Sequence, residues 1–338
     1  MGVPAYGAVV VCLMGSAHPT VLESWRVDVG EIVIQEYEPK YRQSCIDLLS
    51  ATFRGTSNEQ TFQYRFEERS TPPLIIIALD GEDVVSFNSW IPWKFRYEQQ
   101  ELFGFQSGES ATDVNHRRKG IFGKILRYAD QVVPDKDIDF FFGFPGPMSY
   151  SVFFKSGYRP ITTSYYSLKL VPPWRKREKN SVREVNPCFA EYLYQQDKIT
   201  PVLDQEYFSW RYLKNPKKYD IVEYRETSSR ALFVLRRQKW KFISELVLLD
   251  CQFNNYNQDF IQAAFLNLKK RYAGKAIVCR TYCHGHSDRG QALRRIFRIK
   301  VRKGYDVFVV KPVSDKIDEN IIYNQNNWDV MPHCVDDI

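Results

Sequence analysis

The stretch from Ser107 to Leu126 combines residue types that bind phosphate groups: glycines, arginines, lysines and the start of a helix. Apolar residues recur at helical spacing directly after Gly120, so an amphipathic helix is predicted to begin there. The first turn of a helix has free N–H groups and a partial positive charge, and both attract a phosphate. Gly120 and Gly123 let such a ligand approach the backbone closely. The sequence therefore predicts an anion site at the start of this helix.

Positive charge gathers around the same turn, on Arg117, Arg118, Lys119 and Lys124. The glycine spacing is not that of a Walker loop, Gly-x4-Gly-Lys-Ser/Thr, and it is not the dinucleotide fingerprint Gly-x-Gly-x-x-Gly. A motif this short can also be a solvated basic turn, and its spacing alone leaves that alternative open.

A sheet has to position this strand, turn and helix. From residue 31 to 171 the apolar periodicity predicts the order β-α-α-β-β-β-α-β-α-β, an α/β (α+β) mixed sheet with helices on its faces. We expect strands at Ile32–Tyr37, Leu74–Leu79, Val84–Tyr97, Leu102–Asp113, Ile138–Phe144 and Ser164–Leu170, and helices at Lys40–Phe53, Asn58–Arg69, Gly120–Val133 and Tyr150–Lys155.

Residues 172–186 are charged and open with two prolines, which is typical of a linker between two domains. Residues 187–313 loosely repeat the element order of the first part, without a clear sequence repeat. We expect helices through Tyr207–Leu213 and at Asp259–Arg271 and Arg289–Arg298, and strands at Ile221–Tyr224, Ala231–Arg237, Phe242–Leu249, Ala276–Tyr282 and Tyr305–Lys311. Residues 1–30 are expected to be a disordered extension and residues 314–338 a loosely held polar tail.

The segment Ser107–Leu126 resembles the acyl-CoA-binding motif of the GNAT N-acetyltransferase superfamily. The core of that motif, Arg/Gln-x-x-Gly-x-Gly/Ala, corresponds here to Arg117-Arg118-Lys119-Gly120-Ile121-Phe122. The stretch from Phe141 to Tyr158 is similar to the next strand and helix of that superfamily, which end in a Gly-aromatic pair. The resemblance covers residues 31–171. Residues 187–313 more weakly resemble the degenerate second domain of tandem members, and they lack the Arg-x-x-Gly-x-Gly pattern, so no second CoA site is expected.

The resemblance implies where the cofactor binds. The fourth strand would bond the pantetheine arm and the thioester carbonyl with its backbone, and it would splay from the fifth strand. The pyrophosphate would lie over the amides of the loop and of the first helical turn. The cofactor-binding residues implied in this way are Ser110, Ala111, Thr112, Arg117, Arg118, Gly120, Ile121, Phe122, Gly123 and Lys124.

The sequence departs from the superfamily pattern at three positions. Phe122 stands where the motif has its second small residue, and Gly123 follows one place later. Phe153 aligns with a tyrosine that often protonates the departing thiolate, and Gly146 aligns with a common asparagine. The assignment of catalytic groups therefore depends on other residues.

Acyl transfer to an amine needs a base for the amine, a polarised thioester carbonyl and a proton for the leaving thiolate. Glu109 is the candidate base, because strand alternation puts it on the same face as Ala111 and Asp113. Tyr150 is the candidate acid. A surface carboxylate or a salt bridge for Glu109, and aromatic packing under the cofactor for Tyr150, are the alternatives. Trp90 and Trp93 could wall the acceptor pocket or could pack in the core.

These residues predict a CoA-dependent N-acyltransferase that moves an acetyl group from acetyl-CoA to a primary amine of a small molecule or amino sugar. The amine would attack directly in a ternary complex, without a covalent enzyme intermediate. Two alternatives stay open: a Fem-like aminoacyl transferase, which also pairs two GNAT-like domains, and a non-catalytic acyl-CoA-binding module.

Composition limits the other classes of function. The 338 residues are 44% apolar and carry a net charge of +7, which suits an anionic cofactor but does not by itself indicate nucleic acid. No apolar run reaches the length of a membrane-spanning helix. The seven cysteines are odd in number and scattered, so a reducing, cytoplasmic setting is expected. The oligomeric state is left open.

Two further clusters have simple explanations. Cys279, Cys283, His284 and His286 lie within eight residues, but their spacing fits no common zinc site, so no metal is expected. The stretch from Arg289 to Lys303 is strongly basic and contains no acidic residue. It could face a polyanion, although a solvated helix face is the usual explanation.

Overall fold

A computed structural model describes residues 32–171, 182–185, 197–240, 242–283 and 287–330. The extension expected at residues 1–30 and the last eight residues lie outside this part of the chain. The strands are β1 (Ile32–Glu36), β2 (Leu74–Asp80), β3 (Asp83–Tyr97), β4 (Gln100–Thr112), β5 (Phe140–Gly143), β6 (Arg159–Leu170), β7 (Val182–Glu184), β8 (Thr200–Pro201), β9 (Asp220–Glu226), β10 (Ser229–Trp240), β11 (Ile243–Phe253), β12 (Val278–Cys283) and β13 (Ile299–Pro312). The helices are α1 (Arg42–Thr52), α2 (Glu59–Phe62), α3 (Ile121–Val132), α4 (Tyr150–Lys155), α5 (Gln205–Phe208), α6 (Gln258–Tyr272), α7 (Asp288–Ile296) and α8 (Glu319–Ile322).

Short 3-10 or π turns complete the described elements. Two of them, η2 and η6, are π-helices that directly continue α2 and α5. The short turns are η1 (Pro39–Tyr41), η2 (Gln63–Glu67), η3 (Val114–His116), η4 (Val133–Asp135), η6 (Ser209–Leu213) and η7 (Gln325–Asn327).

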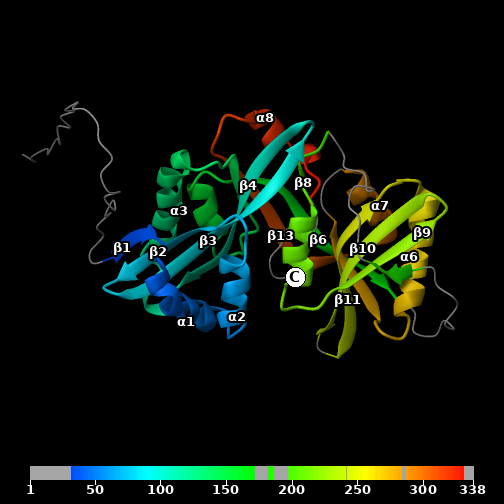
Figure 1. The fold of residues 1–338 in the computed structure, drawn as a ribbon, viewed down its shortest axis with the longest axis horizontal. Coiled ribbons are helices and arrows are strands. Elements are labelled where there is room, and N and C mark those ends of the chain that lie inside the picture. Colours follow the sequence, from blue (N-terminus) through cyan, green and yellow to red (C-terminus); the bar gives the residue numbers. More distant parts are fainter. Residues whose placement is uncertain (1–31, 172–181, 186–196, 241, 284–286, 331–338) are drawn as a thin grey trace, which may run out of the picture.

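The strands form one continuous mixed sheet in which two halves exchange their last strands. The order is β1-β2-β3-β4-β5-β13-β6-β12-β11-β10-β9-β7, and β8 pairs with β3. Thus β13, from the second half of the chain, lies next to β5, while β6, from the first half, lies next to β12. Strands β6 and β13 pair antiparallel at the centre, where the two lobes of the molecule meet (Figure 1). The predicted mixed α/β fold is confirmed.

Helices cover both faces of the first half of the sheet. Apolar residues on α3 and α4, such as Ile125 and Phe153, pack with Ile76 of β2 on one face. Leu49 of α1 and Phe66 of η2 pack on the other face. Successive residues of β2 point to opposite faces and its first six residues are buried, which is why the sequence there is an unbroken apolar run.

The second half repeats this arrangement. Helices α6 and α7 cover one face through a cluster that includes Phe265 and Leu293, while Phe208 and Tyr212 of α5 and η6 pack on the other face. In each half only one strand pair is parallel, β4 with β5 and β11 with β12, among the described strands. Both halves therefore have the same strand order, read outward from the exchanged strands.

The expectation of a polar tail after residue 313 is wrong as far as residue 330. Ile322 and Trp328 are completely buried and Val330 is 2% exposed, and they pack with the aromatic core of the first half. The few apolar residues of this segment are separated by polar ones, so no helical or strand period revealed that they are buried. In addition, β7 lies within the stretch expected to be a linker, where it pairs with β9.

Most predicted elements occur close to their expected bounds. Tyr150–Lys155 is helical over the predicted range, and Asn58 caps α2 with a capping box. Strand β6 begins five residues earlier than expected, at Arg159. No helix in the described part of the chain is long and apolar enough to cross a membrane.

Candidate functional site

The candidate site is the opening between β4 and β5. These parallel strands pair from Gly104 with Phe140 to Ser107 with Gly143, and the pairing stops there. Strand β4 then continues for five more residues, to Thr112, with β3 as its only strand neighbour among the described residues. The edge of β4 that faces β5 therefore has no strand partner beyond Ser107 among the described residues, which is the separation of the two strands that the resemblance implies.

A β-bulge bends β4 directly after the last pair. The register steps from Phe87 opposite Ala111 to Ser89 opposite Gly108, and Glu109 has a positive φ of 53°. The hydroxyls of Ser89 and Ser86 donate to the carbonyls of Gly108 and Ala111 at 3.0 and 2.8 Å. Those carbonyls therefore point to β3. Because backbone groups alternate along a strand, the backbone of Ser110 points to the opposite edge, into the opening.

The helix α3 begins beside this opening. Gly120 is its N-cap, in the left-handed conformation at φ 75°, and no side chain caps the first turn. A Cβ at Gly120 would meet no atom within 4 Å, and the residues from Arg117 to Gly120 are exposed. A Cβ at Gly123 would meet Val152 of α4 at 3.5 Å, so Gly123 lets α4 pack closely. No side chain caps the N–H groups at the start of α3, and an anion site there stays a prediction.

Polar contacts hold the loop between β4 and α3. The Arg117 side chain donates from Nε to the carbonyl of Thr112 at 3.0 Å. His116 lies between two carboxylates, with Nδ1 at 3.0 Å from Asp113 and Nε2 at 2.9 Å from Asp80. The hydrogen bond to Asp113, followed by that to Asp80, raises the pKa of His116 above its ordinary value. This loop is therefore tied to the β2–β3 turn.

Glu109 lies on the face of the sheet covered by α1 and α2, where it forms an ion pair with Arg65 of η2. Its side chain is 5% exposed and that of Arg65 is 14% exposed. The Ser57 hydroxyl donates to the same carboxylate at 3.4 Å. Glu109 therefore lies beside the opening but is held in a buried ion pair rather than at the surface.

Tyr150 begins α4, and its ring packs edge-on against Phe154, with 4.1 Å between the ring centroids. One turn later Phe153 is 2% exposed and packs against both Phe122 and Tyr158. Phe122, the large residue in a position of the motif that is usually small, thus joins the start of α3 to α4. Tyr150 stays the candidate acid only as a proposal.

The two tryptophans have different surroundings. Trp90 is completely buried on the α3 face, and its indole N–H donates to the Tyr158 hydroxyl at 3.3 Å. Trp93 lines a cavity between the two halves, together with Tyr207 and Trp210 of α5 and η6. Of the two, only Trp93 borders a cavity that a ligand could enter.

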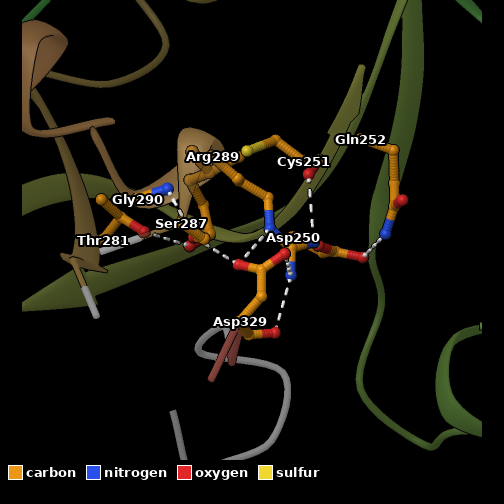
Figure 2. A network of polar contacts seen from close by, with 9 residues as sticks. Asp250, Cys251, Gln252, Thr281, Ser287, Arg289, Gly290 and Asp329 are labelled. Carbon is orange, nitrogen blue, oxygen red and sulfur yellow. Dashed lines mark hydrogen bonds and ion pairs between the residues drawn. The ribbon is translucent and has the colours of Figure 1, made fainter. Parts of the chain in front are cut away.

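At the matching position of the second half, a network of polar contacts surrounds Arg289 (Figure 2). The β11–β12 pairing ends at Val247 opposite Arg280, and β11 continues to Phe253. Beyond that point the Arg289 guanidinium donates to the Asp250 carboxylate at 3.2 Å and to the Cys251 carbonyl at 3.4 Å. Asp329 binds the same guanidinium from the C-terminal segment, at 3.0 Å. This geometry agrees with the absence of a second Arg-x-x-Gly-x-Gly motif.

Arg289 therefore corrects the interpretation of the basic stretch as a solvated face. It is 3% exposed, whereas Arg294, Arg295 and Arg298 are exposed. Burial by itself lowers the pKa of Arg289, but the charges of Asp329 and Asp250 outweigh it and raise the pKa. Cys279 is buried, which raises the pKa of its thiol to about 12. His284 and His286 lie outside the described residues. Among the residues that the structure describes, no group of His, Cys, Asp and Glu could hold a metal ion.

Arg65 and Asn88 were missed by sequence reasoning, and Arg65 had a signal. Phe62-Gln63-Tyr64-Arg65-Phe66 and Phe208-Ser209-Trp210-Arg211-Tyr212 share the pattern Phe-x-aromatic-Arg-aromatic. Each runs from the end of a short α-helix into a π-helix, and the Tyr64 and Trp210 rings stack at 5.4 Å. This repeat marks equivalent positions of the two halves. Asn88 had no such signal.

Residues 33–161 match the family model described as an acetyltransferase (GNAT) domain. A comparison with curated protein sequences returned no match.

Several solved structures share the fold over most of the chain. A protein of Enterococcus faecalis described as a probable N-acyltransferase is 12% identical, covering 83% of this chain and 73% of its own, with a TM-score of 0.62. A GCN5-related N-acetyltransferase from Anabaena variabilis is 12% identical, covering 84% and 73%, with a TM-score of 0.61. N-myristoyltransferase from Saccharomyces cerevisiae, bound to myristoyl-CoA, is 9% identical, covering 84% and 83%, with a TM-score of 0.56.

Proposed function

Because residues 33–161 form a GNAT acetyltransferase domain, we propose that this chain is a CoA-dependent N-acyltransferase. It transfers an acetyl group from acetyl-CoA to the primary amine of a small molecule or amino sugar. The observation that carries the proposal is the open edge of β4 beside the uncapped start of α3. The first provides backbone groups for a thioester and its pantetheine arm, and the second provides amides for a pyrophosphate.

The proposed reaction divides the chemical roles among three groups. The amine nitrogen attacks the thioester carbon, the carbon–sulfur bond breaks, and the thiolate takes a proton as it leaves. The backbone N–H of Ser110 faces the developing oxyanion, Glu109 accepts the proton from the amine directly or through water, and Tyr150 supplies the proton to sulfur. Both substrates bind together, so no covalent enzyme intermediate is needed.

The packing at the closed end of the opening favours a short acyl group. Gly143 pairs with Ser107 there, and a Cβ on Gly143 would lie 3.3 Å from the Ser107 carbonyl oxygen. Phe105 and Phe153 fill one face of the sheet behind this point, and Phe142 fills the other, each 8% exposed or less. A long acyl chain would have to displace these rings, whereas an acetyl group would not.

A non-catalytic acyl-CoA-binding module is the second candidate. Phe153, in the position where the superfamily often has its acid, favours it, because a phenyl ring cannot protonate a thiolate.

The Fem-like alternative is less well supported, because that class does not rely on a CoA pyrophosphate loop. The two domains are proposed to span residues 31–171 and 187–313, and the buried thiols of Cys45, Cys251 and Cys279 suit a cytoplasmic setting.

Calorimetric titration with acetyl-CoA, followed by a thiol-release assay against a panel of amines, tests the proposal. Binding with turnover on an amine is the expected result. Binding without turnover on any amine would support the module instead. Absence of acetyl-CoA binding would contradict both, and affinity for aminoacyl-tRNA would then support the Fem-like alternative.

A further inference from the structure

Asn88 is a buried polar residue of β3, and it lies opposite the bulge of β4. Its neighbours Phe87 and Ser89 pair with Ala111 and Gly108, while Asn88 itself has no partner on β4 and pairs only with Ile76 of β2. Its side chain is completely buried. Burying an amide costs free energy unless its hydrogen bonds are satisfied, so the partners of Asn88 are informative.

Those partners are the two serines on either side of the bulge. The Asn88 amide donates from Nδ2 to the Ser107 hydroxyl at 3.1 Å and to the Ser89 carbonyl at 3.2 Å. Its carbonyl oxygen Oδ1 accepts from the Ser110 hydroxyl at 2.5 Å. Because the Ser89 carbonyl can only accept, it fixes which end of the amide carries the N–H groups.

The positions of these serines give the contacts a consequence for the opening. Ser107 is the last β4 residue paired with β5, and Ser110 is the residue whose backbone faces the opening. One rigid side chain therefore connects the closed end of the opening to the backbone segment beyond the bulge. Ser86 and Ser89 hold the carbonyls on the edge of β4 that faces β3. The opposite edge of β4, which faces the opening, is held by Asn88 through Ser107 and Ser110.

We propose that Asn88 is a positioning residue for acyl transfer, which holds the Ser110 backbone where the thioester carbonyl binds. The inference rests on the proposed function. A hydrogen-bond donor that is fixed before the reaction stabilises the oxyanion without reorganisation. A displacement of about 1 Å in such a group can lower the rate about a hundredfold. Asn88 acts through Ser107 and Ser110 and does not itself touch the substrate.

The substitution Asn88→Asp tests this, because it keeps the shape of the side chain and an acceptor for the Ser110 hydroxyl, but removes the N–H groups given to Ser107 and to Ser89 that hold the side chain in place. We expect kcat to fall about a hundredfold. Affinity for CoA, which lacks the thioester carbonyl, should stay within about twofold because the amides of α3 are untouched. Asn267→Asp is the matched control: the Asn267 amide donates to the Ala263 carbonyl at 3.0 Å on α6, far from the opening, and should leave kcat unchanged.

Amide hydrogen exchange of a peptide covering residues 107–112 provides a readout that does not need turnover. In Asn88→Asp this peptide should exchange faster, while α3 keeps its protection. Unchanged exchange together with unchanged kcat would overturn the proposal. Equal losses of kcat, CoA affinity and global protection would also overturn it, since they would show a purely structural role.

Failure of the proposed function gives a different pattern. A wild-type protein that binds no acyl-CoA and acetylates no amine contradicts the proposed function, and with it any role of Asn88 in acyl transfer. If the wild type is active and Asn88→Asp is equally active, only the role of Asn88 is wrong.

Discussion

Trp328 and Asp329 are neighbours in the chain, but their side chains are buried in different halves of the molecule. The Trp328 ring packs edge-on against Phe95, Phe140 and Phe308 in the core that supports β4 and β5. The Asp329 carboxylate binds Arg289 beside β11 in the second half. These two adjacent residues thus connect the two halves a second time, in addition to the exchange of β6 and β13.

This relationship predicts that the buried ion pairs of Arg289 stabilise the whole molecule. Removing Arg289 would leave the carboxylates of Asp250 and Asp329 buried without a counter-charge, which costs about 3–5 kcal/mol. We expect Arg289→Met to lower the free energy of unfolding by that amount in chemical denaturation, in a single transition for both halves. Glu319→Gln is the control, because the Arg159–Glu319 pair is 61% and 62% exposed. Such surface pairs contribute about 0–1 kcal/mol. Equal effects of the two variants would contradict the prediction.

The place of Gly120 at the start of α3 allows a direct test of the anion site. In Gly120→Glu a carboxylate would stand at the open start of α3, so acetyl-CoA affinity should fall at least about a hundredfold by charge repulsion, as measured by calorimetry. A glutamate in the left-handed backbone conformation of position 120 also costs about 1–2 kcal/mol in strain. The effect of strain on affinity must therefore be measured separately from that of charge. Gly274→Glu provides the match, because Gly274 has the same φ of 75° and is exposed in the second half. If both variants lose affinity equally, strain rather than charge is the cause.

The ion pair of Glu109 and Arg65 allows stability and catalysis to be separated. Glu109→Gln removes the carboxylate from a largely buried arginine, so we expect it to lower the melting temperature and also kcat. In the double variant Glu109→Gln/Arg65→Met the charge is removed as well, and the melting temperature should partly recover. If Glu109 is the general base, kcat should not recover with it. A double variant with restored turnover would exclude Glu109 as the base.

His116 predicts a pH dependence of the loop before α3. Asp113 and Asp80 raise its pKa above the ordinary 6.5, so its contribution to stability is complete below pH 6.5 and is lost as the pH rises through the raised value. The hydrogen bond from His116 lowers the pKa of Asp113 below 3.8, so that contribution is present above pH 3.8 and is lost as the pH falls through the lowered value.

The loop should therefore be held most firmly between about pH 4 and pH 6.5. The melting temperature of the wild type minus that of His116→Gln should be largest in this window, and this difference should shrink above it. Both partners of His116 are partly exposed, so the effect should be small and should weaken with salt. A difference that is constant from pH 5 to pH 9 would rule out this coupling.

The sequence by itself determined the local elements and the start of α3. The period of its apolar residues, the glycine at position 120 and the cap at Asn58 act within a few residues, so a short window contains their whole signal. The order of strands and helices in the first half follows from the same local patterns. The resemblance at residues 107–126 added the kind of ligand to expect there.

Only the tertiary structure decided which distant residues meet. Lys311 of β13 forms an ion pair with Asp130 of α3 at 2.5 Å, across 181 positions of sequence. The exchange of β6 and β13 that brings them together leaves no periodic trace in the sequence. The same holds for Arg65 beside Glu109 and for Asp329 beside Arg289, because a charged residue has the same local pattern whether it meets water or a partner. Burial selects the partner, and burial is a property of the whole fold.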